Sequence, residues 1–240
     1  MTSPASPDPL SGLLLVDKPS GHTSHDVVAR IRSRFRIRKV GHGGTLDPMA
    51  TGLLILLVGR ATKLSDRVIG HDKTYEGALR LGIETDTQDA EGSPVATAAP
   101  AAVAAITPAD LLRAFAALTG DIIQVPPMAS AKKIDGVRLY KLARKGHVVE
   151  RPPAHVHVHQ FVLARFDPPD ATFQVSCSKG TYVRTLAHDA GRALGVGAHL
   201  IQLRRTRIGP FSIAQATPLQ TILDSPSLAP FLLPLDTPLD

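Results

Sequence analysis

The stretch from Gly41 to Gly52, GHGGTLDPMATG, constrains this chain more than any other part of its sequence. Its glycines permit backbone conformations and close approaches that side chains forbid. Pro48 disfavours a helical conformation for Asp47 and so holds this carboxylate in extended backbone. We interpret the loop as a display site for Asp47, where the backbone of a ligand comes close. A surface turn opened by Asp-Pro is the alternative interpretation of the loop on its own.

The segments on either side of this loop differ in kind. A helix is predicted to begin after Thr23, with Asp26 as its capping-box partner, and a buried strand is predicted over Leu53–Val58. Just before the loop, six cations occur within ten residues: Arg30, Arg32, Arg34, Arg36, Arg38 and Lys39. A solvated helix face normally carries both signs of charge. A run of one sign therefore favours contact with nucleic-acid phosphates, above all through Arg36, Arg38 and Lys39.

The composition points to a polyanionic partner. The net charge is +6, and aromatic residues make up only 4% of the chain, which argues against a broad base-stacking platform. Cys177 is the sole cysteine, so an internal disulfide is excluded, a reducing compartment is favoured, and a buried strand position is expected. Residues 1–10 are predicted to form a flexible tail without a signal-peptide pattern, and the longest apolar run is too short to cross a bilayer. We expect a cytoplasmic protein without a membrane partner.

Apolar patterns and turn signals outline the rest of the chain. Strands are predicted over Gly12–Val16, Lys73–Leu81 and Thr172–Cys177, and helices over Ala61–Ile69, over Pro108–Leu118 and after Ser178. Pro94–Ile106 is Ala-rich and is interpreted as a linker. The segment 124–151 is basic, includes Lys132 and Lys133, and has little apolar surface, so we expect a mobile clamp.

His155, His157 and His159 alternate along a predicted strand and therefore share one face. Three imidazoles could bind zinc, but no fourth ligand or supporting carboxylate lies nearby in the sequence. We interpret them as a solvent-facing strand and expect neither a metal nor a cofactor.

A lone aspartate among cations limits the possible chemistry. The Walker-type phosphate loop is absent, whereas attack by a carboxylate on the anomeric carbon of a sugar is compatible with these residues. An arginine partner would keep such a carboxylate ionised and oriented. Two other classes remain open: an RNA-binding or RNA-folding protein in which the carboxylate is incidental, and a nucleoside hydrolase or glycosidase. The last usually needs paired carboxylates or an acidic calcium cluster, and neither is evident.

The chain resembles the TruB family of tRNA pseudouridine synthases over nearly its whole length. The matching blocks are DKPSGHTSHD, GHGGTLDPMATGLL, KTYEG, LGIETDTQDAEG, QVPPMASAKKIDGVRLYKLARKG and CSKGTYVRTLAHDAGRALGVGAHLIQLRRTRIGPF. The resemblance implies an α+β pseudouridine synthase fold, with a long, mixed, mainly antiparallel sheet flanked by helices and a basic thumb over 124–151. It also implies isomerisation of the uridine at position 55 in the T arm of tRNA.

Site residues follow from the same resemblance. Asp47 is the expected nucleophile, Tyr75 stacks on the flipped base, and Arg184 pairs with Asp47. The remaining expected substrate contacts are His42, Tyr182, Leu203 and Lys18. The expected contacts with the RNA backbone are Arg36, Arg38, Lys39, Lys132, Lys133, Arg204 and Arg205.

The resemblance also sets expectations for domains, and the chain departs from the family pattern in places. We expect a monomer with one catalytic domain over residues 11–240 and no PUA-like C-terminal RNA-binding domain, and hence weaker tRNA binding than in longer relatives. Gly43 stands where the family commonly has Thr, and Ala129 where it commonly has Tyr. Contacts that those side chains would make are therefore in question.

Overall fold

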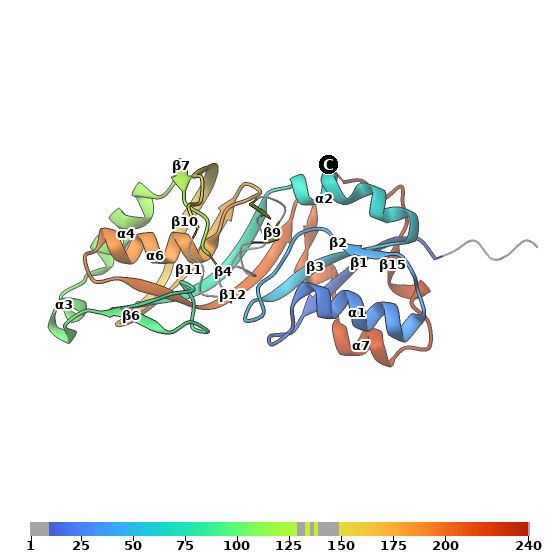
Figure 1. Cartoon of the computed structure of the whole chain (residues 1–240), viewed down its shortest axis with the longest axis horizontal. Helices are drawn as coiled ribbons and strands as arrows, with labels where there is room; N and C mark the ends of the chain where they lie inside the picture. Colours follow the sequence, from blue (N-terminus) through green and yellow to red (C-terminus); the bar gives the residue numbers. More distant parts are fainter. Residues whose placement is uncertain (1–9, 129–132, 135–136, 139–148, 240) are drawn as a thin grey trace, which may run out of the picture. The chain divides into compact units, whose positions relative to one another are not determined.

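The computed structural model describes residues 10–128, 133–134, 137–138 and 149–239 (Figure 1). The chain forms two compact units, residues 1–71 with 207–240 and residues 72–206. Residues 1–9 of the predicted N-terminal tail, most of the predicted thumb, and Ala129 fall outside the described ranges. Within those ranges, no helix is long and apolar enough to span a membrane.

The first unit is built on two apolar strands. β1 (Gly12–Lys18) pairs antiparallel with β3 (Thr51–Val58), with Leu15 opposite Ile55. β1 also pairs in parallel with β14 (Thr217–Pro218) and antiparallel with β15 (Leu232–Leu233). β2 (Val40–His42) pairs antiparallel with β3. β13 (Phe211–Ser212) pairs antiparallel with Arg207–Ile208. Most residues of β1 and β3 are buried on both faces, as their unbroken apolar runs predict.

Helices cover this part of the sheet. α1 (Ser24–Phe35) begins with the predicted capping box, in which the Thr23 hydroxyl and backbone N–H lower the pKa of Asp26. It lies beside α7 (Leu219–Asp224), as Figure 1 shows. The remaining helices are η1 (Gly59–Leu64), α2 (Ser65–Gly70), η2 (Ile213–Gln215) and η3 (Ala229–Phe231). The core includes Leu13, Leu57, Val68 and Phe211.

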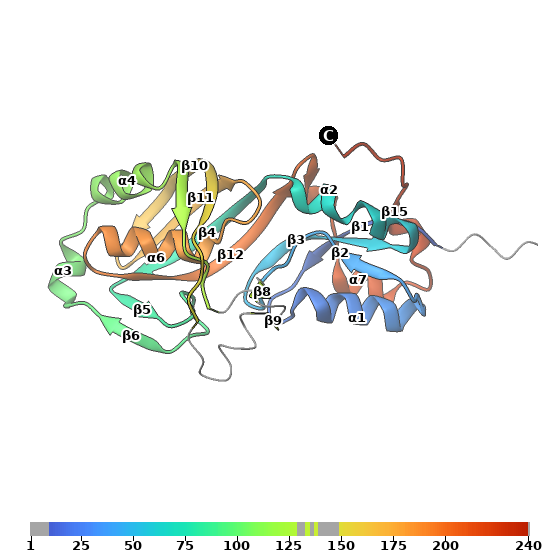
Figure 2. The same ribbon diagram turned by 45° about the horizontal axis from the view of Figure 1, so that its top comes forward.

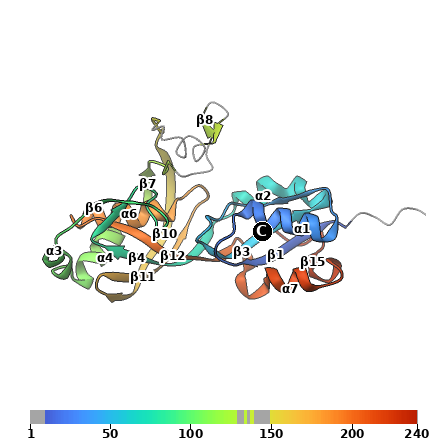
Figure 3. The same cartoon turned by 60° about the horizontal axis from the view of Figure 1, so that its bottom comes forward.

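The second unit contains the strand order β12-β4-β11-β10-β7 (Figures 2 and 3). The strands are β4 (Lys73–Leu81), β7 (Gly120–Gln124), β10 (Ala154–Asp167), β11 (Asp170–Cys177) and β12 (Ala198–Ile208). Pairing of β4 with β11, of β11 with β10 and of β10 with β7 is antiparallel. β8 (Lys133–Ile134) and β9 (Val137–Arg138) form a separate hairpin within the predicted thumb.

Two helices pack on this unit's core. α4 (Pro108–Ala117) contacts α6 (Val183–Ala193) and β10. Phe115 of α4 stacks on Phe161, with ring centroids 3.8 Å apart, and Phe173 meets Phe161 edge-on at 5.2 Å. Three rings from different elements therefore fix the helix against the strands.

The predicted linker over Pro94–Ile106 is wrong. It contains β6 (Pro94–Thr97), which pairs with β5 (Ile83–Thr85), and α3 (Pro100–Ala104). The predicted helix over Ala61–Ile69 is instead a 3₁₀ turn followed by α2. The predicted fold class is confirmed: α+β, with a long, mixed, mainly antiparallel sheet flanked by helices.

Candidate active site

Asp47 lies in a loop of the first unit whose neighbouring residues are anchored on both sides. Before it, the backbone N–H of Leu46 donates to Ser24 Oγ at 2.8 Å, and Ser24 Oγ donates to the Leu46 carbonyl at 3.3 Å. After it, the Pro48 carbonyl accepts the Gly21 N–H at 2.9 Å. The Asp47 side chain is half-buried. Held by hydrogen bonds on both flanks, the loop presents this carboxylate with little conformational freedom.

Lys18 is hydrogen-bonded to the same loop through the Pro48 carbonyl. Its side chain is 0% exposed, and its ammonium donates to the carbonyls of Pro19 at 2.9 Å, His22 at 2.7 Å and Pro48 at 3.3 Å. These bonds give Lys18 a structural role in the turn. Its expected contact with the substrate stays a prediction. A buried ammonium needs several acceptors, and here the turn carbonyls supply them.

His42 and Gly43 lie at the start of the same glycine-rich stretch. His42 ends β2 and meets His25 edge-on, with ring centroids 5.2 Å apart. Gly43 donates its N–H to the Ile55 carbonyl at 2.8 Å, which fixes it against β3. A Cβ at Gly43 would lie 2.2 Å from Val68 Cγ1, so Val68 fills the space that a threonine side chain would need.

Tyr75 lies in the second unit, in the middle of β4. Its side chain is 8% exposed, and it pairs across the strands with Val175. Lys73 is two residues away on the same face and is also buried, opposite Cys177. Burial and the nearby charge of Arg205 lower the pKa of Lys73 to about 8. Burial raises the pKa of the Cys177 thiol to about 11.

Arg184 is buried at the start of α6, with 3% of its surface exposed. Its guanidinium donates to the Thr87 carbonyl at 2.9 Å and lies 3.6 Å from the carboxylate of Asp89. Asp89 in turn accepts from Thr87 Oγ1 at 2.6 Å and from the Glu91 N–H at 3.1 Å. Sequence reasoning missed Asp89, because an acidic residue in a turn rich in Asp, Thr and Gly is usually solvated.

Tyr182 and Leu203 were expected to contact the substrate. Tyr182 is half-buried and is the N-cap of α6, and its backbone is hydrogen-bonded by the side chain of Gln124. Leu203 is buried in β12. Gln124 was expected only as the first residue of the thumb, and its buried amide gave no signal in the sequence.

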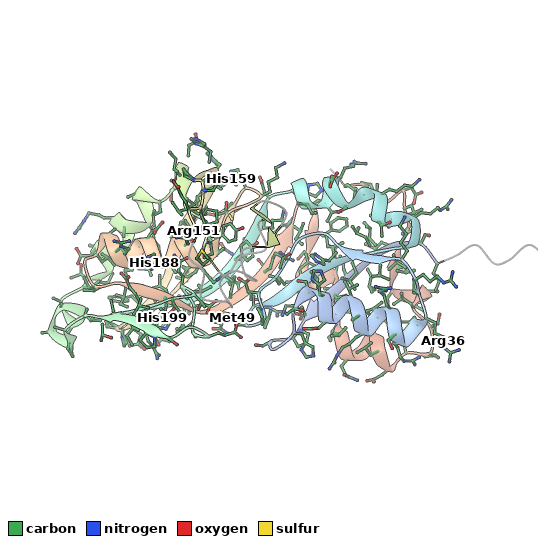
Figure 4. The ribbon with its side chains drawn as sticks, viewed as in Figure 1. Arg36, Met49, Arg151, His159, His188 and His199 are labelled. Carbon is green, nitrogen blue, oxygen red and sulfur yellow. The ribbon has the colours of Figure 1, made fainter. Side chains whose placement is uncertain are left out.

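The expected RNA-backbone cations separate into groups. Arg36, Arg38 and Lys39 are exposed, and Arg36 extends from the end of α1 (Figure 4). Arg204 is half-buried, Lys132 lies outside the described residues, and of Lys133 the structure describes only the backbone. Arg205 is 1% exposed, and its charge lies near buried Lys73. Its expected contact with the RNA backbone stays a prediction.

Arg34 differs from the rest of the basic run. Its Nε donates to the Leu223 carbonyl and its Nη2 to the Ser225 carbonyl, each at 2.7 Å. Both acceptors lie at the end of α7, where helical carbonyls lack partners. Arg34 therefore joins two helices.

The histidine strand is solvent-facing, as predicted, but carboxylates do lie beside it. His157 Nδ1 is 2.7 Å from Asp121, and His159 Nε2 is 2.8 Å from Asp72. Both aspartates come from other segments of the chain, so spacing in the sequence could not reveal them. In the described part of the chain, no group of three or more such side chains is arranged to hold a metal ion.

The expected site residues are divided between the two units. Lys18, His42 and the Asp47 loop belong to the first unit, and Met49 marks that loop in Figure 4. The second unit contributes a larger set: Tyr75, Tyr182, Arg184 and Leu203. The pairing of Asp47 with Arg184 stays a prediction.

Two family models match this chain. Residues 32–183 match the model of the TruB family pseudouridylate synthase N-terminal domain, and residues 184–240 match the tRNA pseudouridylate synthase B C-terminal domain. The chain belongs to the TruB family of pseudouridine synthases, which are isomerases.

Similar proteins agree with this assignment. A tRNA pseudouridine synthase B from Opitutus terrae is 51% identical, with 94% of this chain and 93% of that protein covered. One from Corynebacterium jeikeium is 48% identical, with 91% and 73% covered. Among solved structures, a Cbf5-Nop10-Gar1 complex matches with 31% identity and a TM-score of 0.69, covering 89% of this chain. This chain spans 54% of that matched chain.

Proposed function

We propose that this chain converts uridine to pseudouridine at position 55 in the T arm of tRNA, with Asp47 as the catalytic carboxylate. Family membership supports the reaction, and relatives that are about half identical carry the name tRNA pseudouridine synthase B. The observation that carries the assignment of Asp47 is the loop that holds it. Leu46 and Pro48 are each fixed by hydrogen bonds, so the carboxylate between them is preorganised.

The reaction is a balanced isomerisation. The bond between N1 of uracil and C1′ of ribose breaks, and a bond between C5 and C1′ forms. C5 loses its proton and N1 gains one, so substrate and product have the same composition. Asp47 assists cleavage either by attacking C1′ or by promoting an elimination, and both routes need an ionised carboxylate. Neither route consumes an oxidant or a reductant.

Substrate access requires that the nucleotide leave its stack. Flipping costs a few kcal/mol, which phosphate contacts and a new stacking partner offset. We assign the stacking to Tyr75, worth about 1–3 kcal/mol. We assign the phosphate contacts in the first unit to Arg36, Arg38 and Lys39, which are exposed. Buried Leu203 would help to exclude water from the pocket.

A pseudouridine assay on a T-arm stem-loop and on full-length tRNA tests this proposal. Wild-type protein should form pseudouridine, whereas Asp47→Asn should lose turnover and still bind tRNA with a similar Kd. The matched control is Asp66→Asn, the same chemical change at an exposed position of α2 in the same unit. It should leave turnover unchanged.

Three results would count against parts of the proposal. Turnover by Asp47→Asn removes Asp47 from the chemistry. Release of free uracil indicates a hydrolase instead. Binding of tRNA without any base modification indicates an RNA-binding or RNA-folding protein. The expectations of a monomer and of a cytoplasmic location stay predictions, and size-exclusion chromatography with light scattering checks the first.

A further inference from the structure

A buried amide at the end of β7 contacts the start of α6. Gln124 is 1% exposed, whereas Ile123 and Val125 on either side of it are exposed. Alternation along a strand directs its side chain to the opposite face from theirs. Its Oε1 accepts the Tyr182 N–H at 3.0 Å, and its Nε2 donates to the Tyr182 carbonyl at 3.3 Å. Both polar groups of the amide are therefore used on the backbone of one residue.

These two bonds fix the conformation of Tyr182. Its N–H belongs to the peptide plane before its Cα and its carbonyl to the plane after it, so holding both restricts φ and ψ together. Tyr182 is the N-cap of α6 and has no side-chain cap of its own. Its carbonyl also accepts the Leu186 N–H at 3.2 Å, within the first turn. Gln124 thereby fixes the N-cap of the helix, two residues before Arg184.

The other end of the same loop is held by β10. The Ser178 N–H donates to the His157 carbonyl at 2.8 Å, and Ser178 Oγ accepts the His157 N–H at 2.9 Å. β7 and β10 pair with each other, with Ala154 opposite Gln124. The loop that leads into α6 is thus fixed at both ends by two strands that are themselves paired.

We propose that Gln124 is a positioning residue for pseudouridine formation: it fixes Tyr182 and, through the start of α6, the direction of Arg184. This inference rests on the proposed function. Any buried amide needs hydrogen-bond partners, so a merely stabilising role is the competing interpretation. A stabilising residue changes the folded fraction, whereas a positioning residue changes the rate of the chemical step in fully folded protein.

The experiment measures single-turnover pseudouridine formation on a T-arm stem-loop, with the RNA Kd and thermal unfolding measured for each variant. Gln124→Ala loses both bonds and should lower the rate constant about 10–100-fold, since small misplacements near a reacting centre have effects of that order. The RNA Kd should stay within about threefold.

The pH dependence of the rate in Gln124→Glu distinguishes a positioning role from a merely stabilising one. The ionised carboxylate accepts the Tyr182 N–H but cannot donate to its carbonyl, whereas the protonated acid can make both bonds. The rate of this variant relative to wild type should therefore rise as the pH falls from about 8 to 5.5, because burial favours the protonated acid. Gln174→Glu, the same change at an exposed position of β11, should give a flat ratio.

Each outcome decides the proposal. A folded Gln124→Ala variant with the wild-type rate overturns the proposal. So does a Gln124→Glu variant whose rate relative to wild type does not vary with pH, or varies only as its melting temperature does. If Gln124→Ala does not fold, the pH profile of Gln124→Glu decides. Wild-type activity together with either negative result leaves the proposed function standing. Absence of pseudouridine in the wild-type reaction overturns both.

Discussion

At the scale of single residues, the contact between Arg184 and Asp89 shows how a buried cation is held in place. Asp89 is buried, and it accepts hydrogen bonds from Thr87 and from the backbone of Glu91. A carboxylate fixed in this way orients the guanidinium that faces it. Removing one partner of a buried ion pair typically costs about 3–5 kcal/mol, because the other charge is left uncompensated.

We therefore expect Asp89→Asn to lower the rate of pseudouridine formation at least about tenfold and to lower the melting temperature. Asparagine keeps the shape and can accept the same two hydrogen bonds, so the change isolates the charge. Single-turnover kinetics and thermal unfolding measure the two effects. Asp86→Asn, at an exposed position of the same turn, is the matched control. Unchanged kinetics in Asp89→Asn would contradict a role in orienting Arg184.

Gly43 packs so closely on Val68 that it leaves no room for a side chain. Gly43→Thr should destabilise the protein by about 1–3 kcal/mol, because the new Cβ would overlap Val68. Val68→Ala should relieve part of that cost in the double variant, with a coupling of about 0.5–3 kcal/mol. Urea unfolding of the wild type, the two single variants and the double variant measures this coupling. Gly70→Thr, where a Cβ meets no atom within 4 Å, is the steric control.

At the scale of elements, local signals predicted well and tertiary ones did not. The helix starts at Thr23 and Thr107 were predictable, because caps are local, and both form capping boxes. The strands of the first unit were predictable because continuous apolar runs suit a sheet buried on both faces. β6 gave no such signal, since all of its residues are exposed and it pairs with the short strand β5.

The candidate site divides in the same way. The Asp47 loop could be recognised from glycine, proline and a single acid, and the structure shows how it is anchored. The burial of Lys18 and Arg205 could not be predicted, because a charged side chain is buried only where folding supplies its partners. Asp89 and Gln124 were missed for the related reason that their contacts join segments far apart in the sequence.

At the scale of the whole molecule, two buried groups with shifted pKa values should shape stability at alkaline pH. The pKa of Lys73 is lowered from 10.5 to about 8, so between these values the unfolded chain binds more protons and stability rises with pH. The pKa of Cys177 is raised from 9.0 to about 11, so between these values the folded chain keeps a proton and stability falls. The two effects oppose each other where the ranges overlap.

Cys177→Ala should therefore reveal the effect of Lys73. Its free energy of unfolding should rise by on the order of 2 kcal/mol between about pH 8 and 10.5, whereas the wild type should change less over the same range. Urea unfolding followed by circular dichroism at several pH values measures this. Lys73→Met should show the reverse, a fall between about pH 9 and 11. Identical pH profiles for the wild type and Cys177→Ala would contradict these shifts.

The packing of Val68 on Gly43 also bears on how such a sequence can diverge. A lineage that replaces the glycine first passes through an overcrowded intermediate, whereas one that trims the valine first passes through a merely loosened one. The order of the two substitutions then matters as much as their combined effect on stability. Val68 in α2 thereby restricts which residues can stand next to His42.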